Sequence, residues 1–198
     1  MQQPNTALER PVWWAVDQAL VRRKVLAIAP KFEFYDTQGG LLLYCQQKLF
    51  KFKEDIRVYS DRSKQHEIMT IKARQIIDFS AAYDVVDTQQ NVKVGALRRK
   101  GWKSLFRDSW EILDIEDNVI GYATETGNAL LRRFINIIPQ RFSIELGPEV
   151  VGRIRRSWNP FVFKADVDFT MDPERKLDRR LAMATALLLM AIEGRQQN

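Results

Sequence analysis

The sequence has a single cysteine, Cys45, and a single histidine, His66, among its 198 residues. One cysteine excludes an internal disulfide, and this pair cannot supply any of the common zinc-site spacings. The sequence also has no glycine-rich phosphate loop, no dinucleotide fingerprint and no nucleophile elbow. We therefore expect no metal, no cofactor and no catalytic residue, in a protein of the reducing cytoplasm. An enzyme is left open only through carboxylates that folding brings together.

Long apolar runs are also scarce. The longest lies in RRLAMATALLLMAIEG, where about a dozen residues from Leu181 to Ile192 are apolar except for Thr185. Because crossing a bilayer takes roughly 20 apolar residues, we expect no transmembrane span. The N-terminus lacks the continuous apolar region of a secretory signal. We expect one domain over residues 1–198, with 1–10 and 195–198 as loose tails and 11–20 as a candidate helix.

Most of the chain alternates apolar and polar residues between turn-forming clusters. Phe161, Phe163 and Val167 fall on one face of a strand, for example, while Lys164 and Asp166 fall on the other. This period of two predicts antiparallel strands with one solvated face, and the repeated strand–turn–strand plan predicts hairpins. We count about twelve strands, including a lead-in strand near 25–29.

Two segments have the spacing of helices. One is GNALLRRFINIIPQ, which ends at Pro139. The other is the C-terminal run, with Asp172 as its expected N-cap and Pro173 in its first turn. Since this run is apolar on every side, it must be buried on every side, unless it anchors in a membrane or binds a partner. A closed sheet has no free edges, and a thin, alanine-rich helix can fill its interior.

The predicted fold is therefore mainly β with α. It is an antiparallel, closed β-barrel of about twelve strands around a buried hydrophobic C-terminal helix.

The order of these segments resembles a known group of proteins. Hairpins of the type YDVVDTQQNVKVGALRRK and SWEILDIEDNVIGYATE, closing with FVFKADVDFTMDPERKLDRRLAMATALLLMAIEG, resemble the tubby-like barrel superfamily. The nearest branch is that of the phospholipid scramblases and LURP-one-related proteins, and the likeness covers about residues 21–194. It implies a twelve-stranded barrel around a C-terminal helix and a non-enzymatic protein, because members bind phosphoinositides, are implicated in lipid scrambling or have no settled activity.

The resemblance assigns none of the family's binding residues to positions in this sequence. No motif here aligns with the tubby phosphoinositide pocket. The palmitoylated cysteine cluster of the scramblases is absent, which counts against a scramblase-like membrane attachment.

The segment RRKGWKSLFR combines cations with aromatic residues. The charge of the whole chain is +6, with a pI near 9.5, so anionic partners are favoured. Cations attract anionic lipid, and tryptophan and phenylalanine favour the headgroup region. We therefore predict a lipid- or anion-binding site at Arg98, Arg99, Lys100, Trp102, Lys103, Phe106 and Arg107. The alternatives are a solvated loop whose aromatic residues pack back onto the barrel, or contact with a protein or, less favoured, a nucleic acid.

Other candidates have plainer interpretations. Arg153 and Arg155 share a strand face and could extend a basic patch, with Arg156, Arg132 and Arg133 as further cations. DIEDN at 114–118 has the chemistry of a turn. The acidic residues before the C-terminal helix lack EF-hand spacing, and Cys45 is expected in the core. Trp13 and Trp14 either plug one end of the barrel or face a membrane or partner.

Together these features predict a cytoplasmic binding or regulatory module, with anionic phospholipid or phosphoinositide headgroups as its ligand and peripheral membrane contact. A protein-interaction scaffold with no lipid role is the alternative.

Overall fold

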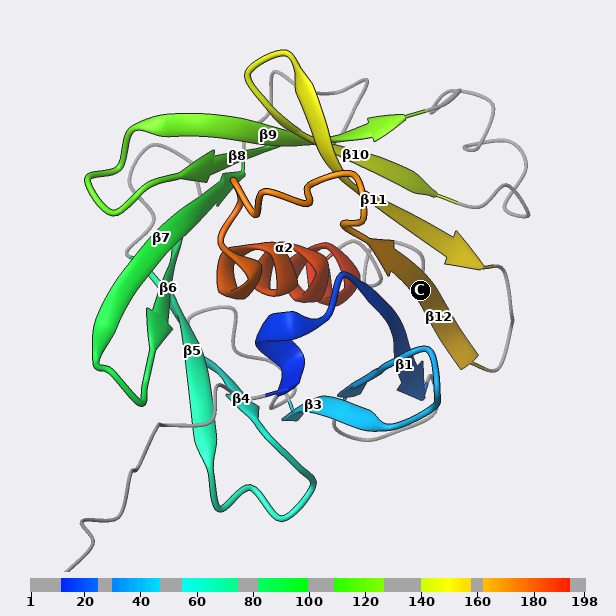
Figure 1. Ribbon diagram of the computed structural model, residues 1–198. Coiled ribbons are helices and arrows are strands. Elements are labelled where there is room, and N and C mark those ends of the chain that lie inside the picture. The colour runs from blue at the N-terminus through cyan, green and yellow to red at the C-terminus, as the bar shows by residue number, and fades with distance from the viewer. Residues whose placement is uncertain are drawn as a thin grey trace, which may run out of the picture.

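The computed structural model describes residues 12–24, 30–46, 55–74, 82–99, 109–126, 140–157 and 162–192. Twelve antiparallel strands close into a barrel, and a helix lies inside it (Figure 1), which confirms the predicted fold. The elements are η1 (Val12–Ala15), β1 (Gln18–Lys24), β2 (Lys31–Tyr35), β3 (Leu41–Gln46), β4 (Ile56–Tyr59), β5 (Glu67–Ala73), β6 (Ala82–Asp87), β7 (Val92–Arg99), β8 (Ser109–Leu113), β9 (Val119–Thr126), β10 (Arg141–Leu146), β11 (Glu149–Ser157), β12 (Val162–Asp168) and α2 (Arg179–Ile192).

The strands form a meander in which each one pairs with its neighbours in sequence. The barrel is closed by β1 and β12, which pair from Gln18 opposite Asp168 to Lys24 opposite Val162. Every strand of this barrel therefore has a partner on both sides, and none presents a free edge.

The helix α2 fills the interior, as its composition predicted. All side chains from Leu181 to Ala191 are buried, and the hydroxyl of Thr185 donates to the carbonyl of Leu181 at 2.8 Å. The wall makes room for the helix at Gly95 of β7, where a β-carbon would collide with Leu113 and with Leu181. The burial shows that this apolar run is the core of the protein and not a membrane anchor.

The start of α2 differs from the prediction. The helix begins at Arg179, and its cap is Asp178, whose carboxylate accepts from the backbone N–H of Arg180 at 2.8 Å. Asp172, the expected cap, lies in the preceding turn and accepts from the N–H groups of Lys176 and Leu177. Both aspartates can cap a helix. Asp172 does not cap α2, because its carboxylate is buried in an ion pair described below.

The hairpin of β8 and β9 packs large side chains against small ones. Trp110 lies opposite Ala123, and Ile112 lies opposite Gly121. Because Trp110 and Ile112 of β8 are buried in the core, the β9 residues opposite them are the small Gly121 and Ala123, while Ile120 and Tyr122 are exposed.

Several predicted segments lie outside the described residues. These are the lead-in strand near 25–29, the helix at 127–139 and the two tails. Where a helix over 11–20 was a candidate, the structure has the short 3-10 turn η1 and then β1 from Gln18 onward.

Candidate functional site

The meander places the strand connections at two rims of the barrel. The turn rim comprises the short turns 36–40, 60–66, 88–91, 114–118 and 147–148, together with residues 169–178 leading into α2. The connection rim is the opposite one, where β1 ends and β2 begins, β3 ends and β4 begins, and so on to β11 and β12.

The two rims differ in charge. Aspartate and glutamate outnumber lysine and arginine in the turn-rim segments, and 114–118 holds three acidic residues and no cation. In the stretches of sequence that join strands at the connection rim, lysine and arginine outnumber the acidic residues, most clearly in 47–54, 100–108 and 127–139. In sequence, therefore, the turn-rim segments are acidic on balance, and the stretches that join strands at the connection rim are basic on balance.

The predicted binding site begins at the connection rim. Arg98 and Arg99 end β7, and the Nε of Arg98 lies 2.6 Å from Oε2 of Glu111 on β8. Arg99 is half-buried and opposite Trp110 in the register of the sheet. The other predicted residues, Lys100, Trp102, Lys103, Phe106 and Arg107, lie outside the described residues. Of the two described arginines, Arg98 already has a carboxylate partner, and Arg99 is half-buried.

A second group of cations lies on the outer face of two neighbouring strands. This β10–β11 cationic face consists of Arg141, Arg153 and Arg155, all exposed. Arg141 and Arg155 lie directly opposite each other, an arrangement that destabilises a sheet when nothing neutralises it. Asp166 lies opposite Arg155 on its other side, yet neither Arg141 nor Arg155 forms an ion pair within the described ranges.

Arg156, the other basic residue predicted on this strand, turns the opposite way. Its guanidinium lies 3.6 Å from the ring centroid of Phe163 and donates to the side chain of Gln140. It is thus engaged with the barrel, whereas Arg153 and Arg155 keep the common outward face that alternation predicted.

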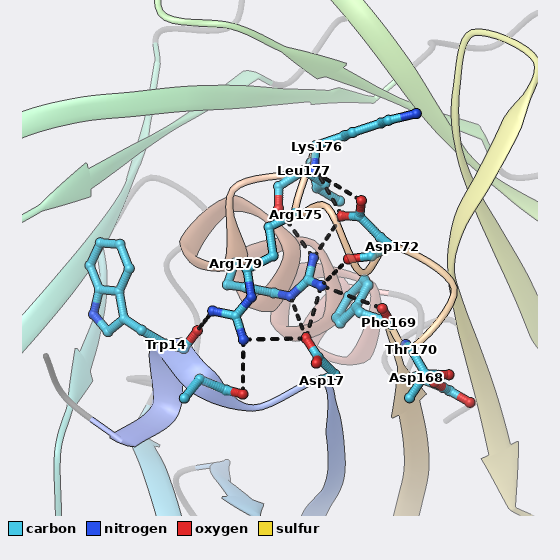
Figure 2. A network of polar contacts seen from close by, with 11 residues as sticks. Trp14, Asp17, Asp168, Phe169, Thr170, Asp172, Arg175, Lys176, Leu177 and Arg179 are labelled. Atoms are coloured by element: carbon cyan, nitrogen blue, oxygen red, sulfur yellow. Dashed lines mark hydrogen bonds and ion pairs between the residues drawn. The ribbon is translucent and has the colours of Figure 1, made fainter.

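The turn rim is held by a buried arginine (Figure 2). Nη1 of Arg179 donates to Oδ2 of Asp172 at 2.8 Å, and both side chains are nearly inaccessible to solvent. Its remaining donors meet Asp17 and the carbonyls of Phe169, Asp172 and Leu177. Because each of its five N–H groups has an acceptor, this arginine joins β1, β12 and α2 and has none left for a ligand.

The N-terminal tryptophans cover the same rim. Trp13 is buried in the core cluster, and the guanidinium of Arg180 lies 4.1 Å from the ring centroid of Trp14. Arg175 donates to the carbonyls of Trp14 and Ala15, which fixes η1 against the turn before α2. Of the two alternatives for this segment, the plug is confirmed.

The comparison with protein families fits this architecture. The model of the LURP-one-related family matches residues 41–190. The chain belongs to the LURP-one-related family. Among solved structures, this LURP-one-related barrel is similar to an X-ray structure of a protein from Arabidopsis thaliana, with 12% identity and a TM-score of 0.54. The match covers 93% of this chain and 96% of that one, and at this identity it shows the fold alone. No curated protein matches the sequence.

The remaining candidates in the LURP-one-related barrel have structural roles. Cys45 is fully buried, and desolvation raises the pKa of its thiol to about 12, which confirms a core residue. His66 is exposed in the turn 60–66. The carboxylate of Asp114 accepts from the N–H groups of Glu116 and Asn118, which confirms 114–118 as a turn.

Asp117 has a role that sequence patterning missed. Its carboxylate accepts from Arg74 at 2.6 Å and from Lys93 at 2.7 Å, and these hydrogen bonds lower its pKa to about 2. The partners lie 43 and 24 residues away along the chain, so only the successive pairing of strands β5 to β9 brings them together.

In the parts of the chain that the structure describes, no three potential metal ligands among histidine, cysteine, aspartate and glutamate gather at one point. No helix in those parts is both long and apolar enough to cross a membrane.

Proposed function

We propose that this LURP-one-related protein is a binding module that docks on anionic phospholipid headgroups with its connection rim. The observation that carries the proposal is the pair Arg141 and Arg155, two exposed arginines that face each other with no ion pair in the described ranges. Such a pair costs stability in the free protein, and an anion placed between the two guanidinium groups relieves that repulsion.

The charge of the rim supports the same function. The cationic face lies near the end of the barrel where the basic stretches of sequence begin and end, so its field adds to theirs. The segment 98–107 brings Trp102 and Phe106 among its cations, a composition suited to the interface of a bilayer. Each cation close to an anionic surface contributes about 1 kcal/mol, so several together give useful affinity.

The experiment is co-sedimentation with vesicles of phosphatidylcholine, alone or with phosphatidylserine or a phosphoinositide, at low and high salt. We expect binding only to the anionic vesicles and weaker binding at high salt, because salt screens exposed charges. Inorganic phosphate at modest concentration distinguishes the two kinds of ligand. It should block vesicle binding if the site takes a free anion, and it should leave vesicle binding unchanged if the site needs headgroups in a bilayer. Binding that ignores lipid charge and salt, or no binding, would contradict the proposal.

A single substitution separates binding from folding. Arg141→Glu replaces the repulsion with a cross-strand Glu–Arg pair, so stability should stay equal or rise by about 0.2–1 kcal/mol. Affinity for anionic vesicles should fall about fivefold or more, because each charge contributes about 1 kcal/mol. Lys64→Glu, with the same change of charge in the exposed turn 60–66, is the matched control and should bind nearly as the wild type.

The predicted loop has its own test. The double change Lys100→Glu with Lys103→Glu should abolish vesicle binding while leaving the unfolding transition unchanged. Arg99 is left intact because it is half-buried opposite Trp110, so a change there would alter stability as well as binding. If this variant binds normally, the site is not on this loop.

A further inference from the structure

The exposed large apolar side chains of the described residues gather in one region. Four belong to the hairpin of β8 and β9, and we call them the hairpin face: Ile115, Val119, Ile120 and Tyr122, each 36–55% exposed. The only other one in that part of the chain is Val92, at the start of β7. Its neighbour Lys93 contacts Asp117 in the hairpin turn at 2.7 Å, so Val92 borders the same region.

This clustering sets the hairpin apart from an ordinary surface. Apolar residues scattered singly over a protein are normal, whereas a contiguous group marks an interaction site. The interior of the barrel explains why β9 turns its larger side chains out, since Trp110 and Ile112 fill the space beside Gly121 and Ala123. It does not explain why the outward positions are isoleucine and tyrosine instead of the polar residues typical of a solvated strand.

Carboxylates border the hairpin face. Tyr122 lies directly opposite Glu145 on β10 and Glu111 on β8, and Glu116 follows Ile115 in the turn. Glu111 is paired with Arg98, but Glu116 and Glu145 form no ion pair with any described residue. The surface thus presents apolar contacts with two carboxylates open to a cation.

The hairpin face is also held in place before any partner arrives. Asp117 joins the turn to Lys93 of β7 and to Arg74 at the end of β5, so the hairpin cannot swing freely. A rigid surface loses little conformational entropy on binding, which favours affinity.

The architecture narrows the kind of partner. Both edges of β8 and β9 are already paired, so an extended peptide cannot add to the sheet. A second copy would bring the same surface, on which the neighbouring cations Arg74, Lys93 and Arg98 are already paired with carboxylates and leave none for Glu116 and Glu145. An anionic membrane is repelled by the same carboxylates.

We propose that the hairpin face is a docking surface for a basic amphipathic helix of a partner protein. Apolar residues at i, i+3, i+4 and i+7 of such a helix cover Ile115, Ile120 and Tyr122, and flanking lysine or arginine meets Glu116 and Glu145. The surface is distinct from the connection rim, so the protein has one end for anionic lipid and a separate side for a cationic helix.

The test uses the full chain and two synthetic amphipathic peptides of equal length, one of leucine and lysine and one of leucine and glutamate. Backbone amide NMR shifts are followed during each titration. The lysine peptide should shift amides of β8, β9 and the end of β10 around Glu145, and the glutamate peptide should shift none of them. Shifts spread over the molecule, centred elsewhere, or equal for both peptides would overturn the proposal.

Variants make the test specific. Ile120→Ser and Glu145→Lys should each weaken the lysine peptide at least about fivefold by fluorescence anisotropy, with unchanged thermal unfolding because both side chains are at the surface. Asp55→Lys, at an exposed position before β4, carries the same charge change as Glu145→Lys and should leave binding unchanged. Equal losses of affinity in Asp55→Lys and Glu145→Lys would show that only the net charge of the protein matters, which overturns the proposal. Self-association of the wild type that disappears in Ile120→Ser would also overturn it, because the surface would then bind a second copy of this chain. Neither outcome depends on lipid binding, so the two proposals can fail separately.

Discussion

At the scale of single residues, the most consequential interaction is the buried pair of Arg179 and Asp172. Their exposed side-chain fractions are 2% and 1%, and the arginine also contacts the carboxylate of Asp17 and backbone carbonyls. Removing one member of a buried pair leaves the other charge in a poorly solvating environment, which costs more than the pair itself contributes.

We therefore predict that Arg179→Met lowers the free energy of unfolding by about 3–5 kcal/mol, measured by urea denaturation. Arg175→Met is the matched control. That side chain is 42% exposed and contacts only the η1 carbonyls and Asp17, so its loss should cost less than about 1 kcal/mol. Similar losses of unfolding free energy in the two variants would show that burial does not make the Arg179 ion pair more important for stability than the exposed contacts of Arg175.

This pair also shows where sequence reasoning stops. Asp172, Pro173 and Glu174 form a plausible helix start, and local chemistry alone favours Asp172 as the cap. The true cap, Asp178, has the same chemistry six residues later. Asp172 is instead buried against Arg179, which also contacts Asp17, 162 residues away, and no local pattern contains that information.

At the scale of elements, Asp117 in the turn of the β8–β9 hairpin forms ion pairs with Arg74 and with Lys93 of β7. This residue has a φ of 70°, a conformation that aspartate and asparagine tolerate better than most. Asparagine can therefore take its place without new backbone strain, while losing the charge that Arg74 and Lys93 contact.

We predict that Asp117→Asn lowers stability at neutral pH by less than about 1 kcal/mol, because the carboxylate is 41% exposed and partly screened. The folded-state pKa of about 2 lies below the ordinary value of 3.8. Its contribution is therefore complete above pH 4 and disappears as pH falls through about 2. Unfolding curves of the two proteins should differ at pH 7 and converge near pH 2. A constant difference at both pH values would show that the ion pairs are not the cause.

For the same hairpin, the alternation of apolar and polar residues predicts the strands but not which of their faces is buried. Alternation in SWEILDIEDNVIGYATE was enough to predict two strands and a turn. It cannot say which set of β9 side chains faces inward, since Ile120 and Tyr122 are the more apolar set and yet lie outside. The choice depends on the neighbouring strand, where Trp110 and Ile112 leave room only for Ala123 and Gly121. The hairpin face was invisible in the sequence for that reason.

At the scale of the whole molecule, the barrel and α2 depend on each other. The buried side chains of the strands and of α2 form one hydrophobic core cluster, and the helix is apolar on every side. This dependence is why the fold could be predicted: the length of the apolar run excluded a membrane span, and only a closed sheet offered a place to bury it.

A charge inside the barrel should therefore prevent folding. We predict that Leu188→Asp, at a position 1% exposed, gives a chain without dispersed amide NMR signals or a cooperative urea transition. Ile115→Asp makes the same chemical change at a position 55% exposed and should unfold as the wild type does. A soluble, cooperatively folded Leu188→Asp protein would mean that the helix is not part of the core.

The two-rim meander has a consequence for how such proteins diversify. The four longest strand-to-strand connections, 47–55, 74–81, 100–108 and 127–140, all start and end at the connection rim. Segments at one end of a rigid scaffold can be exchanged with little effect on stability, as antibody loops are. If the two proposed surfaces are correct, transplanting the connection-rim segments of another LURP-one-related protein onto this barrel should change lipid preference and leave binding of the lysine peptide at the β8–β9 hairpin the same.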